Sequence, residues 1–262
     1  MLIIGELING MYQNIAKAIK AKDKAEIQRC ALEQLKAGAD ALDVNCGPAS
    51  KDPLSDIQWL IEAIQEVTHK PLVLDSSKPK VIASGLAAIK NPAIINSTTA
   101  DAEKLGLLVP LAKKHKAKLI GLTISAGGIP QTKDMRLELA AQIVAACVEQ
   151  EFSPEDLYLD PIVLPVNVAQ AQLREVLESI REFKIISQPP PKTVVGLSNV
   201  SQGSCVRSLI NTTFLTMAAA CGLDAAILDP TDTALMDAAI TAGLILDKQI
   251  YCDSFLDAYR KK

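Results

Sequence analysis

The chain has 262 residues, of which 49% are hydrophobic, so it is long enough to bury the core of one large α/β domain. Its 27 basic and 30 acidic residues leave a net charge of −3, which gives no broad electrostatic reason to bind nucleic acid or an anionic membrane surface. The start of the chain has no basic lead, no apolar run approaches a membrane span, and the six cysteines lack a C-x-x-C pair, so we expect a cytoplasmic protein with reduced thiols.

Short apolar runs with strand character recur along the chain at the spacing of a βα unit. We predict eight strands, centred in chain order on residues 3–8, 41–45, 72–75, 94–96, 119–123, 157–160, 194–199 and 226–229. Runs that are apolar throughout are typical of parallel strands covered by helices on both faces. The pattern therefore predicts an α/β fold of the (β/α)8 TIM-barrel type, with residues 1–262 as a single domain. An open doubly wound sheet is the alternative, but it usually carries a G-x-G-x-x-G or P-loop motif, and the chain has neither.

Amphipathic stretches between these runs predict the covering helices. Ser55 and Gln58 form a capping-box pattern at the start of one helix, and we expect Asp134 to open another. The proline-rich segment 188–191 is rigid and extended, but it is short and directly precedes a predicted strand. We interpret it as a connection and not as a domain linker.

Six of the predicted strands end abruptly in an aspartate or asparagine. These residues are Asp43 with Asn45, Asp75, Asn96, Asp160, Asn199 and Asp229. A single aspartate in such a place is more often a helix cap, but a barrel brings all of these strand ends to one mouth, where barrel enzymes keep their chemistry. We therefore expect one polar pocket. Asp229 is predicted to cap a helix, and at most one of Asp43 and Asn45 is expected to face the pocket directly.

This set of side chains is rich in carboxylates and amides and poor in bases, which limits its ligands. A phosphate would require basic or glycine-rich surroundings. A divalent metal could use several carboxylates, and a neutral heterocycle with several N–H donors, such as a pterin, could also use them. His69 and His115 are the only imidazoles and the cysteines are dispersed, so we expect no structural zinc and no intrinsic metal.

Six short motifs, taken in order, resemble the pterin-binding barrel family. They are GELIN (5–9), LDVNCGP (42–48), LDS (74–76), INS (95–97), LDP (159–161) and GLSNVS (196–201). The resemblance extends over essentially the whole chain. The family includes dihydropteroate synthases, the folate module of cobalamin-dependent methionine synthase, and the methyltetrahydrofolate:corrinoid/iron-sulfur protein methyltransferases, and the chain is most similar to the last group.

The resemblance implies a role for each matching residue. Asp75, Asn96 and Asp160 would hold the pterin ring, and Asn199 would be the catalytic donor that reaches N5. Gln202 and Arg207 would lie near the pterin and the p-aminobenzoyl-glutamate tail. The remaining substrate-binding residues would line or support the pocket, and they are Glu6, Asn9, Asp43, Gly196 and Ser198.

The implied reaction moves the methyl group from N5 of methyltetrahydrofolate to Co(I) of a corrinoid in the reductive acetyl-CoA pathway. Neither histidine lies in an Asp-x-His-x-x-Gly string, and no length is left for a cobalamin module. We therefore expect the corrinoid on a separate corrinoid/iron-sulfur protein that binds transiently. The resemblance also implies a homodimer, for which the alanine-rich stretches 214–223 and 234–246 could supply interface or core.

Other functions fit the same barrel. Dihydropteroate synthases carry a Ser-Arg-Lys-type loop after the seventh strand, whereas residues 198–202 read SNVSQ and contain no lysine. A catalytically silent folate-binding protein is a second alternative, and a carboxylate-bound metal enzyme is a third.

Overall fold

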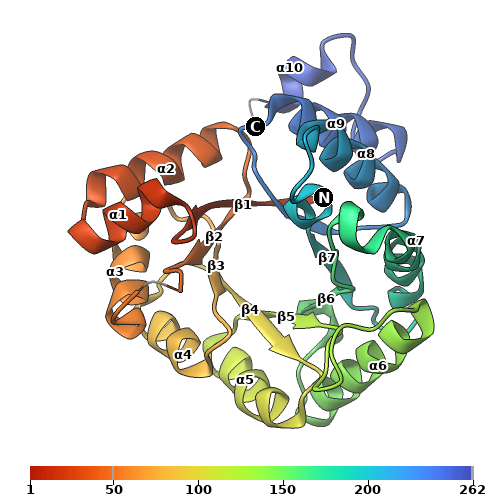
Figure 1. Cartoon of the computed structure of the whole chain (residues 1–262), viewed down its shortest axis with the longest axis horizontal. Coiled ribbons are helices and arrows are strands. Elements are labelled where there is room, and N and C mark those ends of the chain that lie inside the picture. Colours follow the sequence, from red (N-terminus) through yellow and green to blue (C-terminus); the bar gives the residue numbers. More distant parts are fainter. Residues whose placement is uncertain (49, 261–262) are drawn as a thin grey trace.

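Eight parallel strands close into a barrel in the computed structural model, which describes residues 1–48 and 50–260 (Figure 1). The strands are β1 (Leu2–Asn9), β2 (Ala41–Asn45), β3 (Leu72–Asp75), β4 (Ala93–Thr99), β5 (Lys118–Leu122), β6 (Leu157–Asp160), β7 (Lys192–Gly196) and β8 (Ala225–Leu228). Each pairs with the next and β8 pairs with β1, so the predicted (β/α)8 TIM barrel is confirmed.

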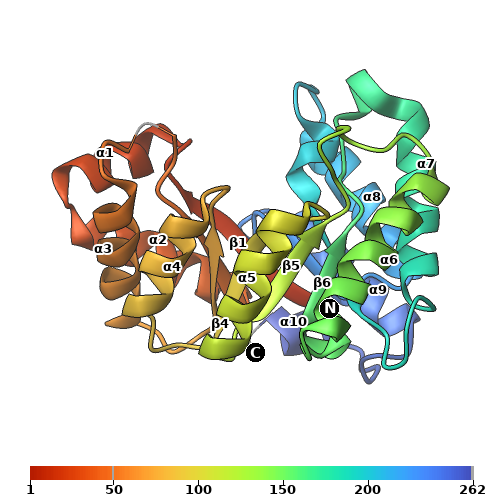
Figure 2. The ribbon, with the colours of Figure 1, turned by 90° about the horizontal axis from the view of Figure 1, so that it is seen from below.

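Helices form a ring around this barrel. They are α1 (Gln13–Ala21), α2 (Lys24–Lys36), α3 (Pro53–Gln65), α4 (Pro79–Ala88), α5 (Ala102–His115), α6 (Lys133–Glu149), α7 (Val166–Phe183), α8 (Arg207–Ala220), α9 (Thr233–Ile245) and α10 (Phe255–Arg260). In the side view of Figure 2, the turn after β7 stands at the upper edge and α10 lies toward the lower edge. Within the described ranges, no helix combines the length and hydropathy needed to cross a membrane.

Three helix starts differ from the prediction. Asp52, not Ser55, caps α3: its Oδ1 accepts from the backbone N–H of Ser55, and Pro53 takes the first helical position, where its missing N–H costs nothing. Thr132 caps α6, so Asp134 lies in its first turn.

The third helix start concerns Asp229. Asp232 caps α9 by accepting from the N–H of Leu235, whereas Asp229 accepts from the N–H and hydroxyl of Thr231. The expected cap at Asp229 is wrong because the chain makes one further turn before the helix begins.

The seventh strand is shorter than the predicted run 194–199. β7 ends at Gly196, and a 3-10 turn follows over Leu197–Ser201. Leu197 and Val200 are buried and stand three residues apart, which places both on one face of such a turn. Because both residues are apolar, the sequence of the turn looks like a continuation of the strand, and the predicted strand was therefore too long.

The barrel interior is filled in layers. One apolar residue from each strand forms the middle layer: Ile4, Ala41, Val73, Ile94, Ile120, Tyr158, Val194 and Ala225. Because side chains on a strand alternate between its two faces, the residue two positions later also points inward. That next layer contains Glu6, Asp43, Asp75, Asn96 and Asp160. Strand periodicity therefore places the polar strand ends on top of an apolar plug.

Candidate functional site

A cavity of about 450 Å³ opens at the carboxyl ends of the strands, and every residue predicted for the site lines it. These residues are Glu6, Asn9, Asp43, Asp75, Asn96, Asp160, Gly196, Ser198, Asn199, Gln202 and Arg207. Met11, Tyr12 and Ile227 also line it and were not predicted. Period-two alternation from Ala225 would have identified Ile227, whereas no motif marked Met11 or Tyr12. The volume is in the range of small-molecule sites.

A β-bulge directs two residues of β1 into this cavity. In the pairing with β2, the two residues Glu6 and Leu7 oppose the single residue Asp43. Leu7 and Ile8 then both pack toward the surrounding helices, and Asn9 returns to the cavity. In a regular strand, residues 6 and 9 would face opposite sides. The bulge therefore lets β1 contribute both a carboxylate and an amide.

Two asparagine–aspartate hydrogen bonds link β2 to β4 and β2 to β3 at the base of the cavity. The amide of Asn96 donates to Asp43 Oδ1 at 3.1 Å, and the amide of Asn45 donates to Asp75 Oδ2 at 2.7 Å. Asp43 lines the cavity, whereas Asn45 supports Asp75 from outside the lining, so one member of that pair faces the cavity as predicted. Each bond leaves other carboxylate lone pairs available to a ligand.

Burial raises the pKa of every carboxyl group in this layer. Asp43 is shifted well above its ordinary pKa by burial and by the charge of Asp75, and burial also raises the pKa of Asp75. Burial raises the pKa of Asp160 to about 7, although the N–H of Ile162 donates to it. Burial also raises the pKa of Glu6, and the hydrogen bond from Ser198 lowers it part of the way back. Burial thus favours protonated carboxyl groups in the ligand-free protein, and a ligand that brings N–H donors would favour ionised ones.

The 3-10 turn after β7 carries Asn199 to the cavity. Ser198 Oγ donates to Glu6 Oε1 at 2.7 Å, and the guanidinium of Arg207 donates to the carbonyl of Ser198 at 3.3 Å. A Cβ on Gly196 would lie 3.0 Å from Asn199 Nδ2, so a residue without a side chain allows this close approach. The Asn199 amide makes no hydrogen bond to the described residues, which leaves it available to a ligand.

Sequence reasoning also missed the buried Arg136 of α6. Its guanidinium donates to the carbonyl of Pro161 at 2.8 Å and to Gln172 Oε1 at 3.0 Å. It therefore holds the segment that follows Asp160 against α6 and α7. No signal in the sequence marks it, because an arginine in the first turn of a surface helix normally reaches solvent.

The raised pKa of Asp160 leads to a stability prediction. Asp160→Asn is expected to raise the melting temperature of the ligand-free protein, and by more at pH 8 than at pH 4. Folding raises the pKa of this carboxyl from its ordinary 3.8 to about 7, so the wild type loses stability as pH rises between these values. Asparagine does not titrate and still accepts from Ile162. Thermal melts of both proteins at pH 4, 6 and 8 test this, and a difference that stays constant with pH would contradict it.

The arrangement suits a flat, neutral ring that donates several N–H groups to carboxylates. Arg207 is the only cation among the described residues that line the cavity, so a polyanion would meet mostly carboxyl groups. Across residues 1–48 and 50–260, no group of three or more His, Cys, Asp or Glu side chains is arranged to hold a metal ion.

Known proteins are similar to this chain in sequence or in fold. A family model described as "Pterin binding enzyme" matches residues 6–229. The methylcorrinoid:tetrahydrofolate methyltransferase of Eubacterium limosum is 31% identical over 266 residues, which cover 100% of this chain and 97% of that protein. Methionine synthase of Mycobacterium tuberculosis is 27% identical over 87% of this chain, which corresponds to only 20% of that longer protein.

Solved structures show the same fold at lower identity. Dihydropteroate synthase from Coxiella burnetii, in complex with pteroic acid, has a TM-score of 0.67 at 16% identity and covers 93% of this chain and 94% of its own. The enzyme from Xanthomonas albilineans, in complex with 7,8-dihydropteroate, has a TM-score of 0.68 at 15% identity, with 95% and 94% covered.

Proposed function

The chain belongs to the pterin-binding enzyme family, and from this premise we propose that it moves the N5-methyl group of 5-methyltetrahydrofolate to Co(I) of a corrinoid. The full-length similarity to a methyltransferase named for a methylcorrinoid and tetrahydrofolate supports this reaction type. That name describes transfer from corrinoid to folate. Because one transition state serves both directions, we propose the same site for both, with the folate-to-corrinoid direction in the reductive acetyl-CoA pathway of the cytoplasm.

The observation that carries the proposal is the convergence of Asp75, Asn96, Asp160 and Asn199 on one cavity. The carboxylates would accept from the 2-amino-pyrimidinone edge of the pterin, and Asn96 would read a carbonyl next to an N–H. Asn199, on the turn after β7, would reach N5. Gln202 and Arg207 would contact the p-aminobenzoyl-glutamate tail, and Glu6, Asn9, Asp43, Gly196 and Ser198 would complete the lining.

The chemical difficulty lies on N5, because a tertiary amine is a poor leaving group. Co(I) supplies the electron pair of the new cobalt–carbon bond, and N5 keeps the pair of the broken carbon–nitrogen bond and gains a proton. The Asn199 amide can donate to N5 where negative character grows, which stabilises the transition state more than the ground state. The amide is not an acid, so the proton itself must come through water or a neighbouring carboxyl group.

The direct test mixes the protein with methyltetrahydrofolate and reduced cobalamin and follows the Co(I) absorbance, with methylcobalamin and tetrahydrofolate for the reverse direction. No transfer in either direction, to free cobalamin or to a corrinoid protein, would defeat the proposal. Folate binding without transfer would indicate the silent binding protein. Product from dihydropterin pyrophosphate and p-aminobenzoate would indicate a dihydropteroate synthase, and activity lost on chelation would indicate a metal enzyme.

We further propose that a separate corrinoid/iron-sulfur protein delivers the corrinoid. Two apolar side chains are exposed at the cavity: Met11, which lines it, at 69%, and Val206, which precedes the lining residue Arg207, at 58%. Exposed apolar groups at the rim of a polar site are typical of an interaction surface. A kcat/KM for the carrier protein far above that for free cobalamin would support this partner.

The proposed homodimer gives a prediction about α8. Arg207 is the only charged residue in this helix, and its outer face exposes Leu209 at 66% and Met217 at 50%. Met217→Glu is expected to convert a dimer into monomers, because a charge would be buried without a partner. Sedimentation velocity measures this. Leu107→Glu on α5 is the matched control, because Leu107 is also a large apolar side chain with about half of its surface exposed (53%), and it should sediment as the wild type does.

A further inference from the structure

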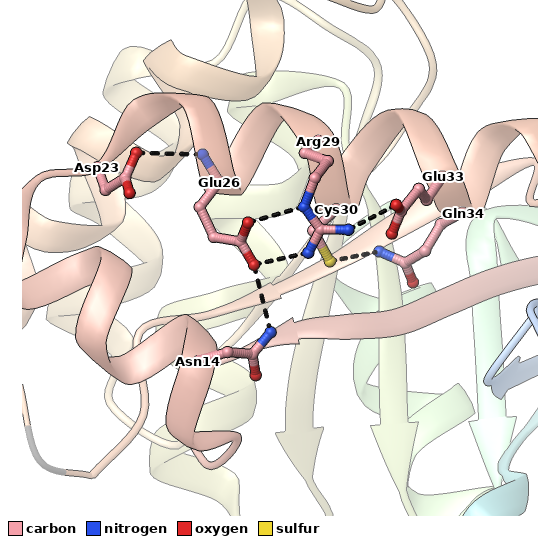
Figure 3. Close-up of polar contacts among 7 residues, drawn as sticks. All are labelled: Asn14, Asp23, Glu26, Arg29, Cys30, Glu33 and Gln34. Atoms are coloured by element: carbon pink, nitrogen blue, oxygen red, sulfur yellow. Dashed lines mark hydrogen bonds and ion pairs between the residues drawn. The ribbon is translucent and has the colours of Figure 1, made fainter.

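A fully buried amide on α2 lies directly behind the β1 bulge. The exposed side of α2 carries an ion-pair network in which Arg29 bonds Glu26 and Glu33 (Figure 3). Gln34 is 0% exposed, and its Nε2 contacts Cys30 Sγ at 3.7 Å. A buried amide requires hydrogen-bond partners, and the sulfur atom is a weak one. The main partner of Gln34 is therefore on its oxygen side.

Gln34 Oε1 accepts from the backbone N–H of Leu7 at 2.9 Å. Leu7 is one of the two bulged residues, so the regular hydrogen-bond ladder with β2 offers no acceptor for its N–H. The glutamine side chain supplies the acceptor instead. Gly5 makes room for it, because a Cβ there would lie 3.0 Å from Gln34 Cδ and would overlap Oε1.

The bulge continues into the site. Glu6 precedes Leu7, faces the cavity, and accepts from Ser198 Oγ at 2.7 Å. Ser198 is followed directly by Asn199 in the 3-10 turn. One sequence of contacts therefore leads from Gln34 through the bulge to Glu6, and from Glu6 to the turn that carries the proposed donor. The residues proposed to hold the pterin ring lie on β3, β4 and β6, outside this sequence of contacts.

We propose that Gln34 is a positioning residue for methyl transfer: it holds the β1 bulge, and through it Glu6 and Ser198, in the form that directs Asn199 into the cavity. The inference rests on the proposed function. A residue that aims the donor without touching the ring should affect kcat and leave folate affinity unchanged.

Gln34→Met tests this, since methionine has a similar volume and no acceptor oxygen. The single-turnover rate of methyl transfer is expected to fall about tenfold, with the Kd for methyltetrahydrofolate within about twofold of the wild type. Gln34→Glu keeps an acceptor for the N–H of Leu7 and should restore most of the rate. The matched control is Gln28→Met on the same helix, whose amide donates to the carbonyl of Ala63, and it should transfer at the normal rate.

A second readout does not depend on activity. Loss of the Ser198 contact should raise the pKa of Glu6 further, since that contact lowers it, and carboxyl NMR titration of Gln34→Met measures this shift. If Gln34→Met does not fold, Gln34→Asn, which withdraws the amide by one methylene, takes its place. A folded variant with an unchanged rate and an unchanged Glu6 titration would overturn the inference. Absence of transfer by the wild type would defeat the proposed function, and the titration alone would then decide the role of Gln34.

Discussion

Asn199→Ala is expected to lower the single-turnover rate of methyl transfer about 10²-fold or more, with a much smaller loss of folate affinity. The donor matters most when electron density grows on N5, so its loss affects the transition state more than the bound substrate. The pterin ring would keep its contacts with Asp75, Asn96 and Asp160. Rapid mixing of the enzyme–folate complex with Co(I) cobalamin measures the rate, and equilibrium binding measures the affinity.

Asn199→Asp is the matched variant for this experiment. It has the shape of asparagine, but an ionised carboxylate cannot donate to N5 and adds charge repulsion as the bond breaks. Its rate should be at least as low as that of the alanine variant at pH 8 and should recover as pH falls and the carboxyl group becomes a donor. A near-normal rate in Asn199→Ala would remove Asn199 from the mechanism.

The positions of the site residues could be predicted because two geometric rules act together. Parallel strands end at the same side of the barrel, and side chains alternate along each strand, so Asp75, Asn96 and Asp160 fall into one layer. These rules use only the position of a residue along its strand. Predicting that these residues lie in one layer therefore required no knowledge of side-chain contacts.

The features that were missed depend on contacts between distant parts of the chain. The bulge that turns both Glu6 and Asn9 inward depends on Gln34, which lies 27 residues beyond Leu7. The buried state of Arg136 depends on carbonyl and amide oxygens contributed by the segment after β6. The propensities of neighbouring residues in the sequence predict neither the bulge nor the burial of Arg136. They also failed at Asp229, where one more turn separated the strand end from the helix cap.

The burial of so many carboxyl groups favours binding at the expense of stability. Burial raises the pKa of each, so ionisation at neutral pH opposes folding. A ligand with N–H donors reverses this preference, because it stabilises the ionised form. Ligand affinity and carboxyl ionisation must therefore be linked, and Asp160 is the group for which the linkage falls near neutral pH.

Binding of methyltetrahydrofolate is accordingly expected to release a proton from Asp160 near pH 7. Burial raises the pKa of this carboxyl to about 7 in the free protein, and pterin N–H donors would lower it again. Affinity should therefore be constant well above pH 7 and should fall as pH decreases through it, by up to about tenfold per pH unit. Calorimetry in buffers of different ionisation enthalpy measures the released proton directly.

Asp160→Asn separates this linkage from general effects of pH. The variant loses charge-assisted hydrogen bonds, so its affinity at pH 8 should be about 10- to 100-fold lower, and the change in affinity centred near pH 7 should disappear. Asp101→Asn is the control: Asp101 caps α5 at the same end of the barrel, and asparagine caps equally well, so folate binding should be unaffected. If Asp160→Asn bound folate with wild-type affinity and the same pH profile, Asp160 would not be an acceptor for the pterin ring, and the proton would have to leave from Glu6, Asp43 or Asp75.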